Sequence, residues 1–424
     1  MASSVAPPQS VEAEKEGALS RRPTSPPSSA KREPKAKSRR RIWFVLHGWL
    51  ALPIWAFLFF ICVTGTLSVV SHEIAWLVDS RVRAPNPDGL EPIGFGAVAG
   101  AVRSEYPEAA VLYINRRAPY LAHSVIVGLP GVPSATAYVN QYTGEVQGIV
   151  RGITFPEFMR SLHAWLLLPW TKGTSIGYYL VGALGVVILG LLVTGVVVHK
   201  RIFRSLHKPI LRRNRGARVW WGDVHRLTGA WCVWFVLTVG ITGSWFLAQG
   251  IMWDAEVFFE PIPPMIARDE VPTLPAGSAA PAVDIDAAVA VAREAVPDFD
   301  VKWIYMPENA FSPVTIVGKQ GFPLISDYAA AAYVNPYAGE VMQSREVSDL
   351  GPVGLVDNLA DPLHFGSWGG LWSRAIWFLF GMGLSTLVLS GFLIWTKRTV
   401  QATLGKEPFE MERATPGLAL ASGE

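Results

Sequence analysis

The sequence is short of charged side chains. Only 17% of its 424 residues are Asp, Glu, Lys or Arg, whereas 50% are hydrophobic, and soluble chains usually carry about a quarter charged residues. The formal net charge is only +3, which gives no global attraction to nucleic acid, so we expect no nucleic-acid partner. The deficit in charge predicts segments that lie in a lipid bilayer.

Cysteines and cofactor motifs are also scarce. The two cysteines, Cys62 and Cys232, both lie inside apolar runs, so we expect small packing residues rather than a disulfide. The sequence contains no nicotinamide or flavin motif, so any redox activity would need an electron donor from elsewhere. The segment 254–361 is acidic but has no metal-ligand spacing, which favours a solvated acidic surface over a metal site or a surface that attracts cationic substrates.

Four uncharged runs are long enough to cross a bilayer, which takes about 20 apolar residues. Lys and Arg cluster before the first run, between the second and third, and after the fourth. Because such clusters stay on the cytoplasmic side, we predict a multi-pass protein of the bacterial cytoplasmic (inner) membrane with both termini inside. The two long connections are then outside. The runs are residues 42–70, 176–198, 227–253 and 375–396.

The two halves of the chain carry matching segments. Residues 138–146 read YVNQYTGEV and residues 333–341 read YVNPYAGEV, and both are typical of a β-hairpin. Each follows an alanine-rich amphipathic stretch, at 97–106 and 285–296, so each outer connection is expected to be an α+β module. We interpret the chain as an internal duplication.

Two histidines repeat at one depth near the inner face. His47 precedes a Thr-Gly pair by 17 positions, and so does His225 in the other half. At 1.5 Å per residue, each histidine lies about 25 Å from its pair along the helix. The two helices run in the same direction, so two imidazoles are expected at equal depth.

Two more histidines repeat near the outer face. His163 stands just outside the second span, and His364 just outside the fourth. Ionisable groups at membrane spans are candidates for function, and neutral imidazole is an axial ligand of haem iron. Two depth-matched pairs therefore predict two haem b groups stacked across the membrane. The alternative is that each histidine is an interfacial side chain whose polar end contacts water.

Two arginines stand beside these histidines. Arg226 follows His225 directly, and Arg160 precedes His163 by three positions. Haem propionates are anionic and favour such neighbours, so both are candidate propionate contacts. A positive-inside residue explains Arg226 equally well, and an ordinary interfacial charge explains Arg160. The other histidines are expected at interfaces (His72, His199) or on solvated surfaces (His123, His207).

Taken in order, these motifs resemble the PepSY-associated transmembrane-helix family, also described as iron-regulated membrane proteins. The resemblance covers roughly residues 40–400 and rests on the two hairpin motifs, on HGWLAL…TG and HRLTGAW…TG in the first and third spans, and on HFGSWGGLWSRAIWFLFG in the fourth. It implies a role in iron uptake, as a haem-containing reductase of a ferric siderophore in the periplasm. Gly48 follows His47 where the family commonly has Arg, which makes the inner site less symmetric.

We therefore predict a membrane protein with four transmembrane α-helices in a bundle and two α+β PepSY-like periplasmic domains, internally duplicated. His47, His225, His163 and His364 would bind the iron of two haem b groups, and a cytoplasmic or membrane donor would supply electrons for reduction of a ferric siderophore or other ferric chelate. The alternative is a non-catalytic PepSY membrane protein that binds peptides or partners, as a scaffold, sensor or protease regulator. A permease is disfavoured because the spans show no broken polar helices.

The expected boundaries follow the same scheme. They are a disordered basic cytoplasmic tail at 1–40, a first transmembrane helix at 41–71, a first PepSY-like domain at 72–162, an outer histidine segment with the second helix at 163–199, a basic cytoplasmic loop at 200–223, a third helix at 224–253, a second PepSY-like domain at 254–362, an outer histidine segment with the fourth helix at 363–397, and a cytoplasmic tail at 398–424.

Overall fold

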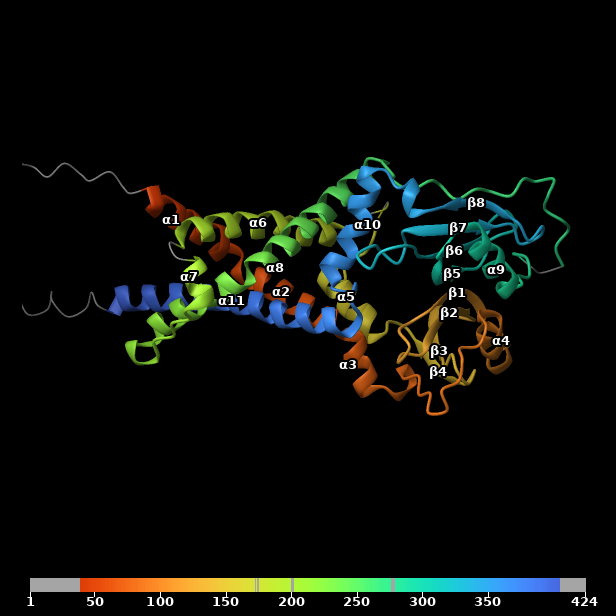
Figure 1. The fold of residues 1–424 in the computed structure, drawn as a ribbon, viewed down its shortest axis with the longest axis horizontal. Coiled ribbons are helices and arrows are strands. Elements are labelled where there is room, and N and C mark those ends of the chain that lie inside the picture. Colours follow the sequence, from red (N-terminus) through yellow and green to blue (C-terminus); the bar gives the residue numbers. More distant parts are fainter. Residues whose placement is uncertain (1–38, 172, 174, 200–201, 276–278, 405–424) are drawn as a thin grey trace, which may run out of the picture.

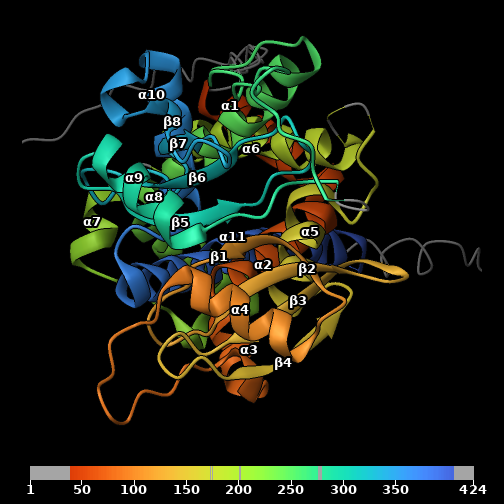
Figure 2. The ribbon, with the colours of Figure 1, turned by 90° about the vertical axis from the view of Figure 1, so that its right-hand side faces the viewer.

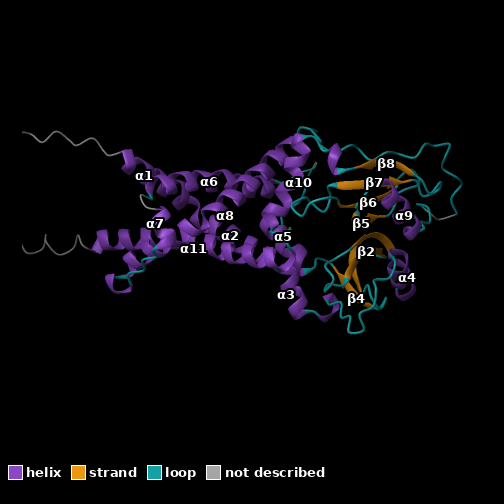
Figure 3. Cartoon of the chain, viewed as in Figure 1, coloured by secondary structure: helices purple, strands orange, loops and turns teal. Residues whose placement is uncertain are grey.

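The computed structural model describes residues 39–171, 173, 175–199, 202–275 and 279–404. They form a long helical bundle with a β-sheet region beyond one end (Figures 1 and 3). The predicted terminal tails lie almost wholly outside these residues. The first helix begins at Arg39 and the last ends at Leu404, both at the end of the bundle remote from the sheet (Figure 1).

Within the described chain, four helical segments are long and apolar enough to cross a membrane, as predicted. The first is interrupted at Pro53, which cannot donate a helical hydrogen bond. Only 22–33% of the residues in their most apolar windows are buried, so most apolar side chains face outward, as lipid contact requires. The segments are α1 (Arg39–Ala51) with η1 (Leu52–Ile54) and α2 (Trp55–Val69), then α6 (Ile176–Val198), α8 (Ala217–Asp254) and α11 (Gly370–Leu404).

Helices α6 and α8 pack backbone against backbone. A Cβ atom at Gly185 would lie 2.4 Å from the backbone nitrogen of Ser244, so only glycine permits this approach. Small residues commonly serve this purpose between membrane helices. The glycines of the second span therefore set how closely these two helices approach.

The described strands form one antiparallel sheet of eight, in the order β4-β3-β2-β1-β5-β6-β7-β8. The halves join where β1 pairs with β5, with Ile114 opposite Ile304. The sequence predicted strands in both modules, but it did not indicate that they share one sheet. The strands are β1 (Ala110–Asn115), β2 (His123–Leu129), β3 (Val132–Val139), β4 (Val146–Arg151), β5 (Asp300–Tyr305), β6 (Val314–Lys319), β7 (Ala330–Val334) and β8 (Val341–Arg345).

Two helices cover the face of the sheet that points away from the bundle (Figures 1 and 2). α4 (Phe95–Glu105) and α9 (Ile285–Ala295) pack fully buried Val98, Val102 and Ala292 against the strands. These helices stand where the alanine-rich stretches predicted them. The predicted hairpins are also present, as β3–β4 and β7–β8.

Two further helices lie between the bundle and the sheet (Figure 1). α5 (Phe155–Trp165) begins with a capping box between Thr154 and Glu157, and α10 (Pro352–Phe365) ends at Gly366 in a left-handed conformation. The boundaries predicted at 162/163 and 362/363 fall inside these helices, because each helix extends well before its histidine. The remaining short helices are α3 (Ser71–Val78), α7 (Ile202–His207), η2 (Ser80–Val82), η3 (Arg213–Arg215) and η4 (Val347–Asp349).

Candidate functional site

The inner pair of histidines comes together in the bundle. His47 on α1 and His225 on α8 have ring centroids 6.3 Å apart, with ring planes at 81°. Both side chains are half-buried. The structure thus brings these two residues, 178 positions apart in the sequence, together across the bundle with nearly perpendicular ring planes.

The outer pair comes together at the sheet end of the bundle. His163 on α5 and His364 on α10 also have ring centroids 6.3 Å apart, with planes at 32°. The two helices that carry them are separate from α6 and α11, since a left-handed residue ends each one. The predicted partners are therefore neighbours, although each histidine stands on a helix of its own rather than at the start of a span.

The spacing of each pair matches two ligands on opposite sides of one metal ion. A metal–imidazole nitrogen bond is about 2.0 Å, and a ring nitrogen lies about 1 Å from its centroid, so the two centroids would be about 6 Å apart. Haem iron takes axial imidazoles in this arrangement. Each histidine pair could therefore hold the iron of one haem.

All four histidines use the same ring nitrogen for hydrogen bonding. His163 and His225 place Nδ1 3.1 Å from the carbonyl oxygens of Ile61 and Leu387, so Nδ1–H donates and Nε2 carries a lone pair. Within the described residues, no hydrogen bond reaches Nε2 of any of the four. A metal-binding histidine has this arrangement, in which one nitrogen is oriented by the protein and the other is free.

A Ser-Gly or Thr-Gly dipeptide on a neighbouring helix receives each histidine, and we call these four dipeptides the Ser/Thr-Gly cradles. The hydroxyl lies within hydrogen-bonding distance of Nδ1, and the ring lies beside the glycine. Only at Gly65 would an added Cβ atom clash with the ring, at 2.6 Å; at the other three glycines it would lie 3.4–4.0 Å away. The recurrence of such a dipeptide in all four spans is visible in the sequence, but it does not indicate which histidine each dipeptide will meet. The partners are Thr194-Gly195 for His47 (2.8 Å), Ser390-Gly391 for His225 (3.0 Å), Thr242-Gly243 for His364 (2.8 Å) and Thr64-Gly65 for His163 (3.4 Å).

The two candidate propionate contacts differ. Arg226 forms an ion pair with Asp223, a carboxylate that also pairs with Arg212 at 2.8 Å, so its guanidinium already has an anionic partner. Arg160 on α5 is exposed, and no ion pair joins it to a described residue. Of the two arginines, Arg160 is the one whose charge is available to bind an anionic group such as a haem propionate.

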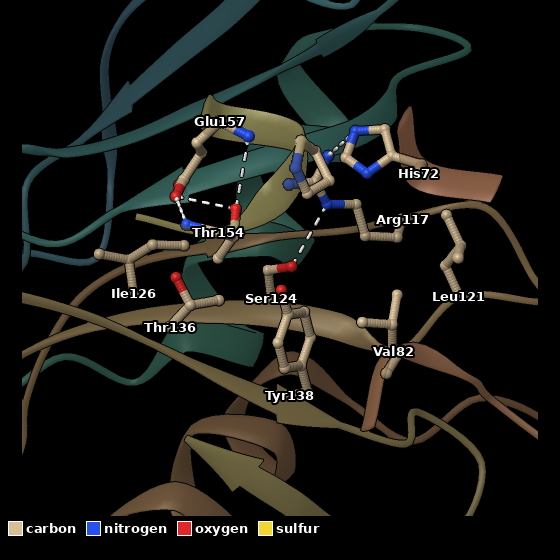
Figure 4. A pocket seen from close by; sticks show the side chains of 12 residues that line it. His72, Val82, Arg117, Leu121, Ser124, Ile126, Thr136, Tyr138, Thr154 and Glu157 are labelled. Atoms are coloured by element: carbon tan, nitrogen blue, oxygen red, sulfur yellow. Dashed lines mark hydrogen bonds between the residues drawn. The ribbon is translucent and has the colours of Figure 1, made fainter. Parts of the chain in front are cut away.

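His123 and His72 belong to neither pair. His123 on β2 is only 5% exposed, so the prediction of a solvated side chain was wrong; burial, and then Arg116, lower its pKa to about 4. His72 on α3 lies 3.3 Å from Arg117 beside a cavity of about 20 Å³ (Figure 4). That volume suits one water molecule. Burial and Arg117 hold the pKa of His72 well below its usual value, so it stays neutral.

Fold and site together define a multi-pass membrane protein that carries an extramembrane α+β region and two pairs of facing histidines. The chain belongs to the family of the PepSY-associated TM region, whose model matches residues 44–398. It is similar to an uncharacterized protein of Pseudomonas aeruginosa, with 28% identity over 255 residues. The match covers 56% of this chain and 64% of that protein, so the chain spans less than two thirds of this relative's length.

Proposed function

We propose that the protein is an inner-membrane di-haem b-type electron-transfer protein that reduces a ferric siderophore or another ferric chelate in the periplasm. One observation carries this proposal. Two histidine pairs, one at each end of the bundle, both have ring centroids 6.3 Å apart, a spacing that would let the two imidazoles of a pair hold one haem iron between them. The proposed orientation has the sheet in the periplasm and the basic loop in the cytoplasm, because lysine and arginine concentrate at the other end.

The chain's own residues would hold and orient the cofactors. Nδ1 of each histidine is hydrogen-bonded within its Ser/Thr-Gly cradle, which would fix the orientation of the imidazole and leave Nε2 to bind the iron. Haem b, when bound, would supply one-electron transfer. The exposed Arg160 is the stronger candidate for a propionate contact, because Asp223 occupies Arg226.

Reduction suits the proposed substrate. Oxygen donors of a chelate are hard ligands that hold Fe(III) more firmly than Fe(II). One electron delivered at the outer face converts one ferric ion to ferrous and weakens its hold. The electron would come from a donor on the inner side. It would enter the protein near His47 and His225.

We further infer that the two outer modules are PepSY-like domains that arose by duplication. Each consists of one helix and four strands, and the strand order is symmetric about the β1–β5 junction. The matching turns at 138–146 and 333–341 occupy equivalent hairpins. The repeat explains why the histidine positions recur at two depths.

The haem content of the purified protein tests the proposal. Protein made with ample haem precursor is expected to be coloured, with a sharp reduced-minus-oxidised absorbance band and about two haems per chain by pyridine haemochrome assay. Ferric chelate added after reduction should reoxidise the bound haem. A folded but colourless protein that also fails to take up added haem contradicts the proposal and favours the non-catalytic scaffold or sensor.

The two haems are expected to give different electron paramagnetic resonance spectra. Imidazole planes near perpendicular, as in the inner pair at 81°, produce a highly anisotropic low-spin ferric signal, whereas the outer pair at 32° should give an ordinary rhombic one. Low-temperature spectra of the oxidised protein would show both signals in equal amounts. Two identical rhombic signals would mean that the cradles do not fix the ring planes.

A further inference from the structure

Four aromatic side chains form a continuous patch on the face of the sheet opposite α4 and α9. The ring centroids of Tyr113 and Tyr305 are 5.3 Å apart, and those of Trp303 and Tyr328 are 5.6 Å apart. Trp303 and Tyr305 are parallel within 9°. Tyr113 on β1 lies across the β1–β5 junction from Trp303 and Tyr305 on β5. Trp303, Tyr305 and Tyr328 pack against a cluster separate from the main core. We call Tyr113, Trp303, Tyr305 and Tyr328 the aromatic platform.

The fold leaves part of the aromatic platform unused. All four side chains are half-buried. The hydroxyls of Tyr113, Tyr305 and Tyr328 find no hydrogen-bond partner among the described residues, and none of these oxygens is fully buried. A tyrosine whose ring packs against the protein while its hydroxyl has no hydrogen-bond partner is typical of binding surfaces. Burial raises the pKa of Tyr305 to about 12, so its hydroxyl remains a donor.

The aromatic platform faces the helices that carry the outer histidines. α5 and α10 lie between the bundle and this face of the sheet (Figure 1). Arg160 precedes His163 by three positions on α5, and Asp361 precedes His364 by three on α10, so each charge lies about one helical turn from its histidine. The charge of Arg160 acts on both Asp361 and Tyr305, so it lies near the outer pair and near the platform.

The surroundings of Asp361 are acidic. Burial, and then nearby carboxylates, raise its pKa to about 7, against the opposing influence of Arg160. Aromatic faces attract cations and repel anions, so the platform and these carboxylates favour the same ligand charge. Two cations oppose them, Arg160 and Arg117, whose guanidinium carbon lies 6.0 Å from the Trp303 ring centroid, but the four carboxylates outnumber them. The carboxylates that act on Asp361 are Asp357, Asp327 and Glu260.

We propose that the aromatic platform binds the ferric chelate, as a compact complex of neutral or single positive charge. Apolar ligand arms would lie on the rings of Trp303 and Tyr305, and free tyrosine hydroxyls would donate to the oxygens that hold the iron. The complex would then sit directly outside His163 and His364. This inference rests on the proposed function, because it takes the chelate to be the substrate.

Binding of redox-silent complexes to the full-length protein in nanodiscs tests the inference. Gallium(III) replaces iron, so binding is measured without electron transfer. One hexadentate hydroxypyridinone ligand is used in three forms: neutral, amine-bearing and trisulfonated. Its gallium(III) complexes then differ in charge, as neutral, cationic and anionic complexes, but have nearly the same shape. We expect the neutral and cationic complexes to bind by calorimetry, and the trisulfonated one to bind at least about tenfold more weakly.

Platform variants locate the site. Trp303→Leu and Tyr305→Leu are each expected to weaken binding about tenfold, whereas Tyr142→Leu, a half-buried tyrosine elsewhere in the outer region, should not. An unchanged haem spectrum shows that each variant is folded. Equal binding by all variants, tightest binding of the trisulfonated complex, or no binding by a haem-loaded protein would overturn the inference while leaving the haem proposal intact. Platform-dependent binding by a protein without haem would do the reverse.

Discussion

Replacing His364 by alanine should remove the outer haem and leave the inner haem in place. His163 would remain as a single ligand, because its partner ring at 6.3 Å is lost. The inner pair lies at the far end of the bundle and shares no hydrogen-bond partner with His364, so the two sites should respond independently. The haem content per polypeptide, measured by pyridine haemochrome assay, is expected to fall by half. Of the two electron paramagnetic resonance signals, only the rhombic signal of the outer haem should be lost.

The reciprocal variant His225→Ala separates the two halves of the electron path. It should lose the inner haem and keep the outer one. In proteoliposomes with the reductant enclosed on the inner side, both variants are expected to reduce external ferric chelate at a background rate. With reductant on the outer side, the haem that remains in each variant is reduced first. The ferric chelate should then reoxidise it only in His225→Ala, which keeps the outer haem. His207→Ala, at an exposed position in the basic loop, is the control. Unchanged haem content in both variants would show that these rings are not the ligands.

Replacing Gly65 by alanine is expected to weaken the outer haem site about 10–100-fold, the usual cost of disturbing a ligand's supporting contacts. A Cβ atom at Gly65 would lie 2.6 Å from Cε1 of His163, whereas carbon atoms in contact are normally about 3.5–4.0 Å apart. His163 would have to move away from its partner ring. Titration of the apoprotein with haem, followed by absorbance, measures the change.

Gly243 is the matched control for Gly65. It occupies the equivalent position in the repeat, after Thr242 in the third span, and its Cβ would lie 4.0 Å from Cε1 of His364. Gly243→Ala should therefore bind both haems as the wild type does. If the two alanine variants behave alike, the glycine does not control the ring of His163, and the Ser/Thr-Gly cradle has no role in the site.

The membrane architecture could be predicted because its signals are local. An apolar run of span length needs no knowledge of the rest of the chain, and α6 begins and ends where the second run does. The hairpins at 138–146 and 333–341 were equally accessible, since turn chemistry lies within a few residues. His123 was misjudged because strand β2 has five buried residues in succession, and a lone polar residue gives no sign of which neighbours cover it.

The candidate site was only partly accessible to sequence reasoning. Helix rise converts spacing into depth, so the repeat predicted which histidines share a level. Spacing along one helix says nothing about the helix beside it. That Thr194 supports His47, and Ser390 supports His225, depends on how α1, α6, α8 and α11 pack.

By itself, the sequence determined the four spans, the two α+β modules and the equal depth of the paired histidines. Each of these follows from composition and period along a continuous stretch of chain. Only the tertiary structure decided that the two modules share one sheet, that α5 and α10 carry the outer histidines, and that Nδ1 of each ring is held by a neighbouring helix. The shared sheet and the support of each Nδ1 depend on contacts between segments 99 or more residues apart, and no local pattern records which distant surface a side chain will meet.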